Sequence, residues 1–258
     1  MTNLFLHRLR EEPPLNIAHR GARTCAPENT LAAFHAALAH GADGIEFDVR
    51  LCRSHEWVVF HDQRLGRTTN GHGYIRMTSL EKIRRLDAGI KFGEAFRSEP
   101  VPTLADALAM AGGRLLLNIE IKAVSNIQTR KLARLLELLY RHEAAHKCVL
   151  SSFNPLILRK LAVLAPEVPT GLILTGHGLH GRTGPPVSRL TGVKGLHVHF
   201  KALTPRFLRA ARERGLYLLV WGANEARQFR PLIDLGVDGI ITDEPRALSQ
   251  LLGRKIHS

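Results

Sequence analysis

Short apolar runs alternate with segments of helical periodicity along most of the chain. Apolar runs of about four to eight residues between glycines and prolines are typical of buried strands, and apolar positions three and four apart indicate amphipathic helices. These patterns predict strands at residues 15–19, 44–49, 57–62, 114–122, 148–153, 171–175, 195–200, 217–222 and 239–243. They predict helices at residues 27–41, 80–86, 104–111, 127–142, 155–164, 205–214, 223–235 and 245–252.

All but one of these strands belong to a repeating strand–helix unit, which gives eight units in a chain of 258 residues. That number of units in a chain of this length is typical of a TIM-like (β/α)8 barrel, so an α/β fold of this type is the prediction. A doubly wound open sheet shares the alternation and is the alternative. Residues 176–192 form a glycine-rich loop in which we place no helix. We expect a single domain over residues 1–258.

The strand predicted at 57–62 is the exception, because it follows the strand at 44–49 after only a short polar turn. A connection this short cannot hold a crossover helix, so the two strands are predicted to form an antiparallel hairpin. The hairpin then carries His61 back toward Glu46 and Asp48.

The segment after the hairpin, residues 63 to about 103, shows neither periodicity over most of its length. Glycine and proline interrupt it repeatedly, at Gly66, Gly71, Gly73, Gly89, Gly93, Pro100 and Pro102. We expect a small inserted lobe here, containing the short helix at 80–86, before the strand–helix alternation resumes.

The strand at 44–49 carries two carboxylates in an otherwise apolar run. Side chains alternate between the faces of a strand, so Glu46 and Asp48 point the same way while Phe47 points the other way. An uncompensated carboxylate inside a protein is costly, and two side by side cost more. The face therefore needs a positive partner, which could be a divalent metal, a lysine or arginine, or several hydrogen-bond donors.

Other polar side chains also fall at the ends of predicted strands. His19 and Arg20 end the first strand, and Trp221 and Asp243 end the last two. Asn118, Glu120 and Lys122 share one face of the strand at 114–122. In a barrel, the strand ends and the loops after them build the active face, so these groups are expected to meet there.

The residue types at this face indicate metal-assisted phosphoryl chemistry. Three carboxylates, including Glu120, suit a hard oxygen-liganded cation such as Mg²⁺ or Ca²⁺. Arg20 and Lys122 suit a phosphate group. His19 and His61 suit a general acid and a general base near neutral pH, since imidazole titrates in this range. A structural pairing of the carboxylates with the two cations, without a metal, is the alternative.

The charge balance favours anionic partners. The chain has 36 Lys and Arg against 23 Asp and Glu, which gives a net charge of +13. A basic protein that binds nucleic acid or another anion without catalysis is therefore one alternative function. The basic residues are spread along the chain and aromatic residues make up 6%, so stacking platforms for nucleotide bases are scarce. We expect no specific nucleic-acid partner.

The cysteines and apolar runs exclude several other classes. Three cysteines, without CxxC spacing, argue against a disulfide framework and a thiolate zinc site. No apolar run has the length needed to span a bilayer, and no secretory signal is visible at the start. The expected location is cytoplasmic, and the oligomeric state is left open.

A set of motifs, in this order, resembles the glycerophosphodiester phosphodiesterase family over residues 17–245. The motifs are His19-Arg20-Gly21, residues 26–34, Glu46-Phe47-Asp48-Val49, His61-Asp62, residues 65–71, Ile119-Glu120-Ile121-Lys122, Val220-Trp221 and residues 242–245. Each motif alone is short. The ordered set is specific.

The resemblance implies a TIM-like barrel that hydrolyses glycerophosphodiesters to sn-glycerol 3-phosphate and an alcohol with one divalent cation, Mg²⁺ or Ca²⁺. By position it assigns an acid/base pair, three metal ligands, two phosphate-binding cations and two side chains beside the glycerol group, namely His19 and His61; Glu46, Asp48 and Glu120; Arg20 and Lys122; and Phe153 and Trp221. Which histidine is the base stays open. So does the choice between direct attack by water and attack by the glycerol 2-hydroxyl.

Two late strands depart from the family's pattern. Gly222-Ala223-Asn224 stands where a Thr-Val-Asn type sequence is usual, and residues 196–200 lack the usual His-Pro. The shape of the leaving-group pocket is therefore open, and a lysophospholipase D-like activity on substrates that keep one acyl chain is an alternative. His197 and His199 share a strand face, where a second metal site is a weaker possibility.

Overall fold

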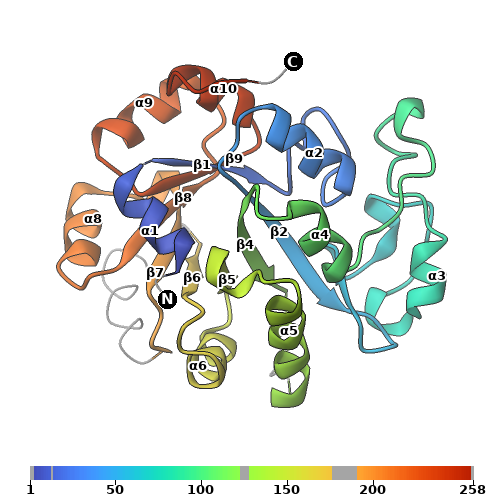
Figure 1. Ribbon diagram of the computed structural model, residues 1–258. Coiled ribbons are helices and arrows are strands. Elements are labelled where there is room, and N and C mark those ends of the chain that lie inside the picture. Colours follow the sequence, from blue (N-terminus) through green and yellow to red (C-terminus); the bar gives the residue numbers. More distant parts are fainter. Residues whose placement is uncertain (1–2, 13, 123–127, 176–190, 257–258) are drawn as a thin grey trace.

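Eight parallel strands close into a barrel in the computed structural model, which describes residues 3–12, 14–122, 128–175 and 191–256 (Figure 1). Around the sheet the strands follow the order β1 (Leu15–His19), β9 (Gly239–Thr242), β8 (Tyr217–Trp221), β7 (Gly195–His199), β6 (Thr170–Leu174), β5 (Cys148–Ser152), β4 (Leu116–Ile121) and β2 (Gly44–Leu51). β1 also pairs with β2, which closes the ring. The (β/α)8 prediction is confirmed, and the open sheet is wrong because an open sheet leaves two edge strands unpaired.

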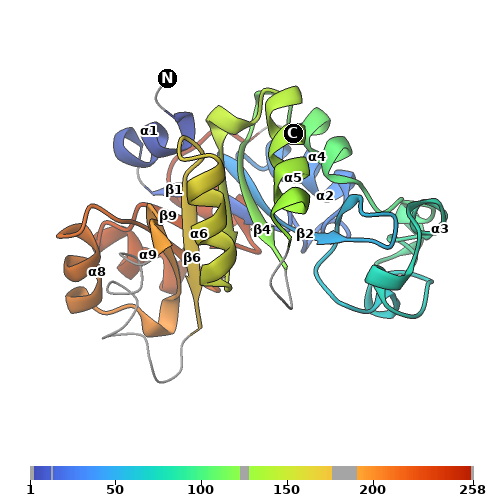
Figure 2. The ribbon, with the colours of Figure 1, turned by 90° about the horizontal axis from the view of Figure 1, so that it is seen from below.

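Helices cover the outer face of the barrel (Figures 1 and 2). They are α2 (Leu31–Ala39), α4 (Leu104–Ala111), α5 (Thr129–Arg141), α6 (Pro155–Leu164), α8 (Pro205–Arg212), α9 (Ala226–Asp234) and α10 (Pro245–Leu251), with 3-10 turns at Ala145–Lys147 and Phe200–Ala202. Local sequence sets several of their starts. Thr103 and Asp106 form a capping box that begins α4, and a proline occupies the first turn of α6, α8 and α10. No helix among the described residues is long and apolar enough to span a membrane.

The barrel interior is apolar at one end and polar at the other. At the amino-terminal ends of the strands, the inward side chains Ile17, Leu116, Val149 and Leu219 form a buried apolar cluster. Alternate residues of each strand face inward. Further along the same strands these inward residues are polar. The polar end therefore lies at the carboxyl ends of the strands.

An additional helix, α1 (Leu4–Glu11), packs against the apolar end of the barrel. Phe5 and Leu9 lie four residues apart on its inner face and are buried in the apolar cluster. Asn3 caps the helix and donates through Nδ2 to the carbonyl of Cys148 at 3.2 Å. No helix was predicted here from the sequence, because the segment has only two turns and is rich in charge. Tertiary packing of two apolar residues stabilises it.

The predicted hairpin is confirmed. β3 (Trp57–Val59) runs antiparallel to β2, with Val49 opposite Val59 and Leu51 opposite Trp57. β3 is shorter than the predicted strand at 57–62 and ends before His61, which lies in the segment after it.

The segment 63–103 folds against the hairpin and contains short helices, at Leu65–Arg67, Ile75–Met77, Leu80–Arg84 (α3) and Glu94–Phe96. An apolar cluster joins the segment to the hairpin, with Leu65, Ile75 and Ile83 from the segment and Val58 and Phe60 from the hairpin side. The predicted loop at 176–192 lies, apart from its last two residues, outside the described residues.

Candidate active site

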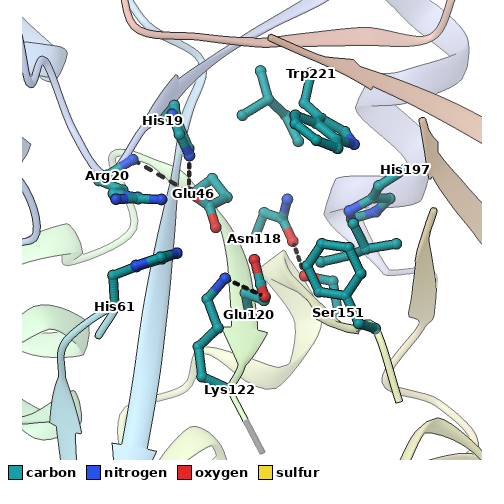
Figure 3. A pocket seen from close by; sticks show the side chains of 13 residues that line it. His19, Arg20, Glu46, His61, Asn118, Glu120, Lys122, Ser151, His197 and Trp221 are labelled. Carbon is teal, nitrogen blue, oxygen red and sulfur yellow. Dashed lines mark hydrogen bonds and ion pairs between the residues drawn. The ribbon is translucent and has the colours of Figure 1, made fainter. Parts of the chain in front are cut away.

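A pocket of about 240 Å³ opens at the carboxyl ends of the strands (Figure 3). Its lining includes the polar strand ends singled out from the sequence together with neutral side chains from the opposite strands, and comprises His19, Arg20, Glu46, His61, Asn118, Glu120, Lys122, Ser151, Phe153, Ile173, His197, Trp221 and Ile241. Eight of the nine predicted site residues are in this set. The ninth, Asp48, is 1% exposed and lies directly beneath Arg20 and Lys122.

The turn after β1 places Arg20 by means of an unusual backbone conformation. Arg20 has a φ of 57° and Gly21 a φ of 81°, both in the left-handed region. A Cβ on Gly21 would lie 2.6 Å from the backbone of Ala33, so only glycine fits. The Arg20 amide donates to the Glu46 carbonyl at 2.7 Å, and its guanidinium reaches Asp48, with Nε 3.3 Å from Oδ2. A strained non-glycine residue at such a position is typical of a functional site.

Three buried carboxylates form the acidic centre of the pocket. Ligand oxygens of Glu46, Asp48 and Glu120 all lie within 4.8 Å of one another. The parallel pairing of β2 and β4 sets this arrangement, since Asp48 is the register partner of Glu120. Lys122 Nζ lies 2.7 Å from Glu120 Oε1 and 3.2 Å from Asp48 Oδ1.

The carboxylates differ in how their charge is balanced. Burial opposes the ionisation of Asp48, but Lys122 and Arg20 outweigh it and hold its pKa below its usual range. Burial and the charges of Asp48 and Glu120 raise the pKa of Glu46 well above its ordinary value. Burial, with the charge of Asp48, also raises the pKa of Glu120. The two cations therefore outweigh burial at Asp48, but at Glu46 and Glu120 burial and the neighbouring carboxylates outweigh the cations.

This imbalance and the donor set both fit a divalent cation. Carboxylate oxygens are the preferred ligands of Mg²⁺ and Ca²⁺, which bind them at about 2.0–2.6 Å, so oxygens within 4.8 Å of one another fit around one ion. A cation at this position would also stabilise Glu46 in its ionised form. Pairing with Arg20 and Lys122 alone, the alternative considered from the sequence, accounts for Asp48 but not for Glu46. The acidic cluster thus suits a divalent metal.

Two of the three histidines that line the pocket, His19 and His61, are held by a carboxylate on Nδ1. His19 Nδ1 lies 2.6 Å from Asp243 Oδ1, and His61 Nδ1 lies 2.6 Å from Asp62 Oδ1. A carboxylate on Nδ1 fixes the tautomer that carries its proton there and leaves Nε2 free to exchange a proton. His19 Nε2 faces the acidic centre, 3.9 Å from Glu46 Oε2. Burial lowers the pKa of His61, with Arg20 and Lys122 acting in the same direction.

Asn224 braces the carboxylate behind His19. Its Nδ2 donates to Asp243 Oδ2 at 3.0 Å, and its Oδ1 accepts from the Asp243 amide at 2.9 Å. Asn224 belongs to the segment that departs from the family's pattern. Gly222 in this segment has a φ of 87°, and a Cβ on it would lie 2.8 Å from His199 Nε2. A glycine at this position therefore leaves room for the His199 ring. The asparagine that braces Asp243 matches the family's pattern.

Glu28 and Arg67 brace the carboxylate behind His61. The Arg67 guanidinium bonds both carboxylate oxygens of Glu28, at 2.9 and 2.6 Å, and also bonds Asp62. Arg20 donates to Glu28 from the other side at 2.8 Å. The sequence analysis did not assign roles to Glu28, Arg67 or Asn224. Glu28 lies inside the motif at residues 26–34, which marks it as a candidate functional residue. The motif does not indicate that Arg67 is its partner.

The opposite wall of the pocket is neutral. Phe153 is 44% exposed at the mouth, where Lys122 Nζ lies 5.5 Å from its ring centroid. Trp221 stacks edge-on with His199 at 4.5 Å between centroids. His197 is 1% exposed, and burial lowers its pKa to about 3. Among the described residues, the Glu46, Asp48 and Glu120 cluster is the one group of three or more potential ligands with metal-binding geometry, and neither His197 nor His199 belongs to it.

The pocket of this closed (β/α)8 barrel brings together two carboxylate-held histidines, an acidic cluster suited to a metal and two cations suited to a phosphate. This arrangement is typical of enzymes that cleave phosphoesters. Residues 19–247 match the Glycerophosphoryl diester phosphodiesterase family. The chain therefore belongs to this family of hydrolases, as the ordered motifs predicted.

Relatives and solved structures agree with this assignment. A glycerophosphodiester phosphodiesterase from Caldanaerobacter subterraneus is 37% identical over 240 residues, which cover 92% of this chain and 97% of that protein. One from Bacillus subtilis is 31% identical and covers 90% of this chain and 84% of that protein. The structure of an Oleispira antarctica phosphodiesterase in complex with the product sn-glycerol-3-phosphate superposes with a TM-score of 0.87 at 29% identity, covering 95% of this chain and 99% of that chain.

Proposed function

We propose that this enzyme hydrolyses glycerophosphodiesters to sn-glycerol 3-phosphate and an alcohol in the pocket at the carboxyl ends of the barrel strands. The observation that carries the proposal is the convergence of two carboxylate-held histidines and two cations on one buried acidic cluster. The product complex of the Oleispira antarctica relative supports it, because that enzyme has the same fold and holds sn-glycerol 3-phosphate.

Arg20 and Lys122 would bind the phosphate group. Both line the pocket beside the histidines, and both are partly buried, so their attraction for an anion is screened less than at the surface. Their positions are fixed from below by Asp48. A phosphodiester therefore meets cations that are already oriented, and binding does not have to order two long side chains.

Glu46, Asp48 and Glu120 would hold one divalent cation, for which Mg²⁺ and Ca²⁺ are the candidates. When bound, such an ion supplies positive charge that offsets the negative charge growing on the phosphate oxygens during cleavage. The three carboxylates are buried and braced, so they hold their oxygens without the substrate.

His19 and His61 would divide the two proton transfers of the reaction. One takes a proton from the attacking oxygen, and the other gives a proton to the oxygen of the departing alcohol. Asp243 and Asp62 keep Nδ1 of each ring occupied, so Nε2 is the atom that exchanges the proton. When water is the nucleophile, cleavage of the phosphorus–oxygen bond leaves sn-glycerol 3-phosphate and the free alcohol. When the glycerol 2-hydroxyl attacks, the alcohol departs and leaves a cyclic phosphate, which water then opens to sn-glycerol 3-phosphate.

Other predictions from the sequence accompany this proposal. We propose that residues 1–258 form one domain with an inserted lobe at about 63–103. A cytoplasmic location and the lack of a specific nucleic-acid partner stay predictions.

A substrate panel tests the proposal. The purified enzyme is incubated with glycerophosphocholine, glycerophosphoethanolamine and lysophosphatidylcholine, each with Mg²⁺, with Ca²⁺ and with EDTA, and released sn-glycerol 3-phosphate and free choline are measured. We expect turnover of the deacylated substrates with a divalent ion and none with EDTA. Turnover of the acylated substrate alone would favour the lysophospholipase D-like activity. No turnover under any condition, together with tight and salt-sensitive DNA binding, would contradict the proposal.

A further inference from the structure

Two neutral side chains that line the pocket each have a buried N–H donor without an acceptor. Asn118 Nδ2 and Trp221 Nε1 are both buried, and neither has a hydrogen-bond partner among the described residues. Buried donors in folded proteins are almost always paired, so an unpaired one calls for an explanation. Because both donors line the same pocket, a ligand that brings acceptor oxygens explains both.

Neighbouring groups fix the direction of the Asn118 amide. Ser151 donates through Oγ to Asn118 Oδ1 at 2.8 Å, and both residues are 0% exposed. Their strands, β4 and β5, are adjacent in the barrel. With the amide oxygen held by Ser151, the NH₂ group is turned toward the open part of the pocket (Figure 3). Asn118 is thus an oriented donor that lies beside Glu46, its register partner on β2.

The wall around these donors is shaped by side chains that do not accept from them. His197 is buried, and its Nε2 lies 3.4 Å from the Tyr217 hydroxyl, on the side away from the pocket mouth. Its ring fits because Gly171 has no side chain: a Cβ there would lie 2.3 Å from His197 Nε2. Ile173 contributes apolar surface. The wall thus offers donors and apolar contact without negative charge.

We propose that Asn118, oriented by Ser151, is a substrate-binding residue whose Nδ2 donates to a hydroxyl oxygen of the substrate's glycerol group. This inference rests on the proposed function. Glycerol esterified at one carbon keeps two hydroxyl groups, and the pocket offers two unpaired donors, Asn118 Nδ2 and Trp221 Nε1. A hydroxyl oxygen accepts such a bond and can still donate to a carboxylate. The two donors therefore select for a polyol, while Arg20 and Lys122 bind the phosphate.

Paired changes in enzyme and substrate test this role. Asn118→Leu keeps the approximate size of the side chain and removes the donor. The substrates are glycerophosphocholine and two analogues, in which propane-1,2-diol or propane-1,3-diol replaces glycerol and removes one hydroxyl. We expect the wild-type enzyme to discriminate against at least one analogue. In Asn118→Leu, kcat/KM for glycerophosphocholine should fall about 10- to 100-fold and the discrimination against that analogue should disappear.

Two further variants serve as comparison and control. Trp221→Phe keeps an aromatic ring and removes the second donor, so it should reduce discrimination against the other analogue. Asn16→Ala removes a buried asparagine whose Nδ2 bonds the Pro245 carbonyl and Ser249. Asn16 does not line the pocket, so this change should lower the Tm and leave the ratio of kcat/KM values among the three substrates unchanged.

Several outcomes would overturn the inference. If Asn118→Leu lowers kcat/KM for all three substrates by one common factor, Asn118 has only a structural role. If the variant matches the wild-type enzyme on every substrate, the donor binds nothing in the reaction. A failure of the proposed function itself is distinguishable from these outcomes, because the wild-type enzyme would then turn over none of the three substrates.

Discussion

The two walls of the pocket differ in the charge and the hydrogen bonding of their side chains. On the wall built by β1, β2 and β4, the charged groups contact one another: Lys122 lies between two carboxylates, and Asp48 contacts Arg20. On the wall built by β5 to β8, the polar side chains are neutral, and Trp221 has an unpaired N–H. The charged wall is thus braced in advance for the phosphate and its reaction. The unpaired N–H groups of Trp221 on the neutral wall and of the neighbouring Asn118 are available to the part of the substrate that does not react.

This contrast separates catalysis from recognition. A network in which each charge is held by others loses its arrangement when one member is removed, so its loss should act on the chemical step. A wall of single contacts loses one contact at a time, so changes there should act mostly on binding. We therefore expect larger losses of activity from changes on the charged wall than from changes on the neutral wall.

The largest losses are expected from His19→Ala and Glu46→Gln on the charged wall. The first removes a group that exchanges a proton, and the second removes a carboxylate from the acidic cluster. We expect kcat to fall by about 10³-fold or more for each, with near-wild-type circular dichroism. Steady-state release of sn-glycerol 3-phosphate is the measurement. Full activity in either variant would place the reaction outside this cluster.

Asp243→Asn should have a smaller effect on the same wall. The amide cannot hold the proton on His19 Nδ1 as a carboxylate does, so the favoured tautomer of His19 changes. We expect a loss of about 10²-fold in kcat with a KM close to the wild-type value. Asn224→Ala removes the brace behind Asp243 and should show a weaker form of the same defect. A large rise in KM with unchanged kcat would show that Asp243 acts in binding instead.

Phe153→Ala tests the neutral wall at its exposed rim. The ring lies near Lys122 Nζ and is nearly half exposed, so its removal takes away contact area without disturbing the acidic cluster. We expect a rise in KM of about 2- to 10-fold and little change in kcat. A loss in kcat as large as that of Asp243→Asn would erase the distinction between the two walls.

The smallest effect concerns stability at low pH. Burial opposes the ionisation of Glu28, but Arg67 and Arg20 outweigh it and lower its pKa to about 2 from the ordinary 4.5. Because the folded-state pKa is below the unfolded value, ionised Glu28 stabilises the fold fully above about pH 5, and this contribution is lost as the pH falls toward 2. Glu28→Gln should lower the free energy of unfolding at pH 7 by about 1–3 kcal/mol and flatten its decline from pH 5 to 3. Urea titrations at several pH values measure both.

The fold and the acidic cluster could be predicted because both depend on local rules. Alternation along one strand is enough to place Glu46 and Asp48 on the same face. The length of the following turn is enough to predict the hairpin that returns His61. Parallel strands also share one carboxyl-terminal end, so residues that end different strands meet once the barrel closes.

Partners and donors on the pocket wall depend on distances that no local pattern gives. His19 and Asp243 are 224 positions apart, and their contact requires the ring to close between β1 and β9. Asn118 was placed on the correct face from the alternation. That its Nδ2 lacks an acceptor follows only from the position of Ser151 on the next strand. Helix α1 was missed because tertiary packing rather than helix propensity stabilises it.

Helix α1 has a consequence for the order of product release. Phe5 and Leu9 cover the amino-terminal end of the barrel, so among the described residues the pocket opens at the carboxyl ends of the strands. With the phosphate bound by Arg20 and Lys122, as proposed, we expect the alcohol to leave through this opening before sn-glycerol 3-phosphate. Inhibition patterns would show this sequence: sn-glycerol 3-phosphate should compete with substrate for the free enzyme, while added alcohol should inhibit noncompetitively.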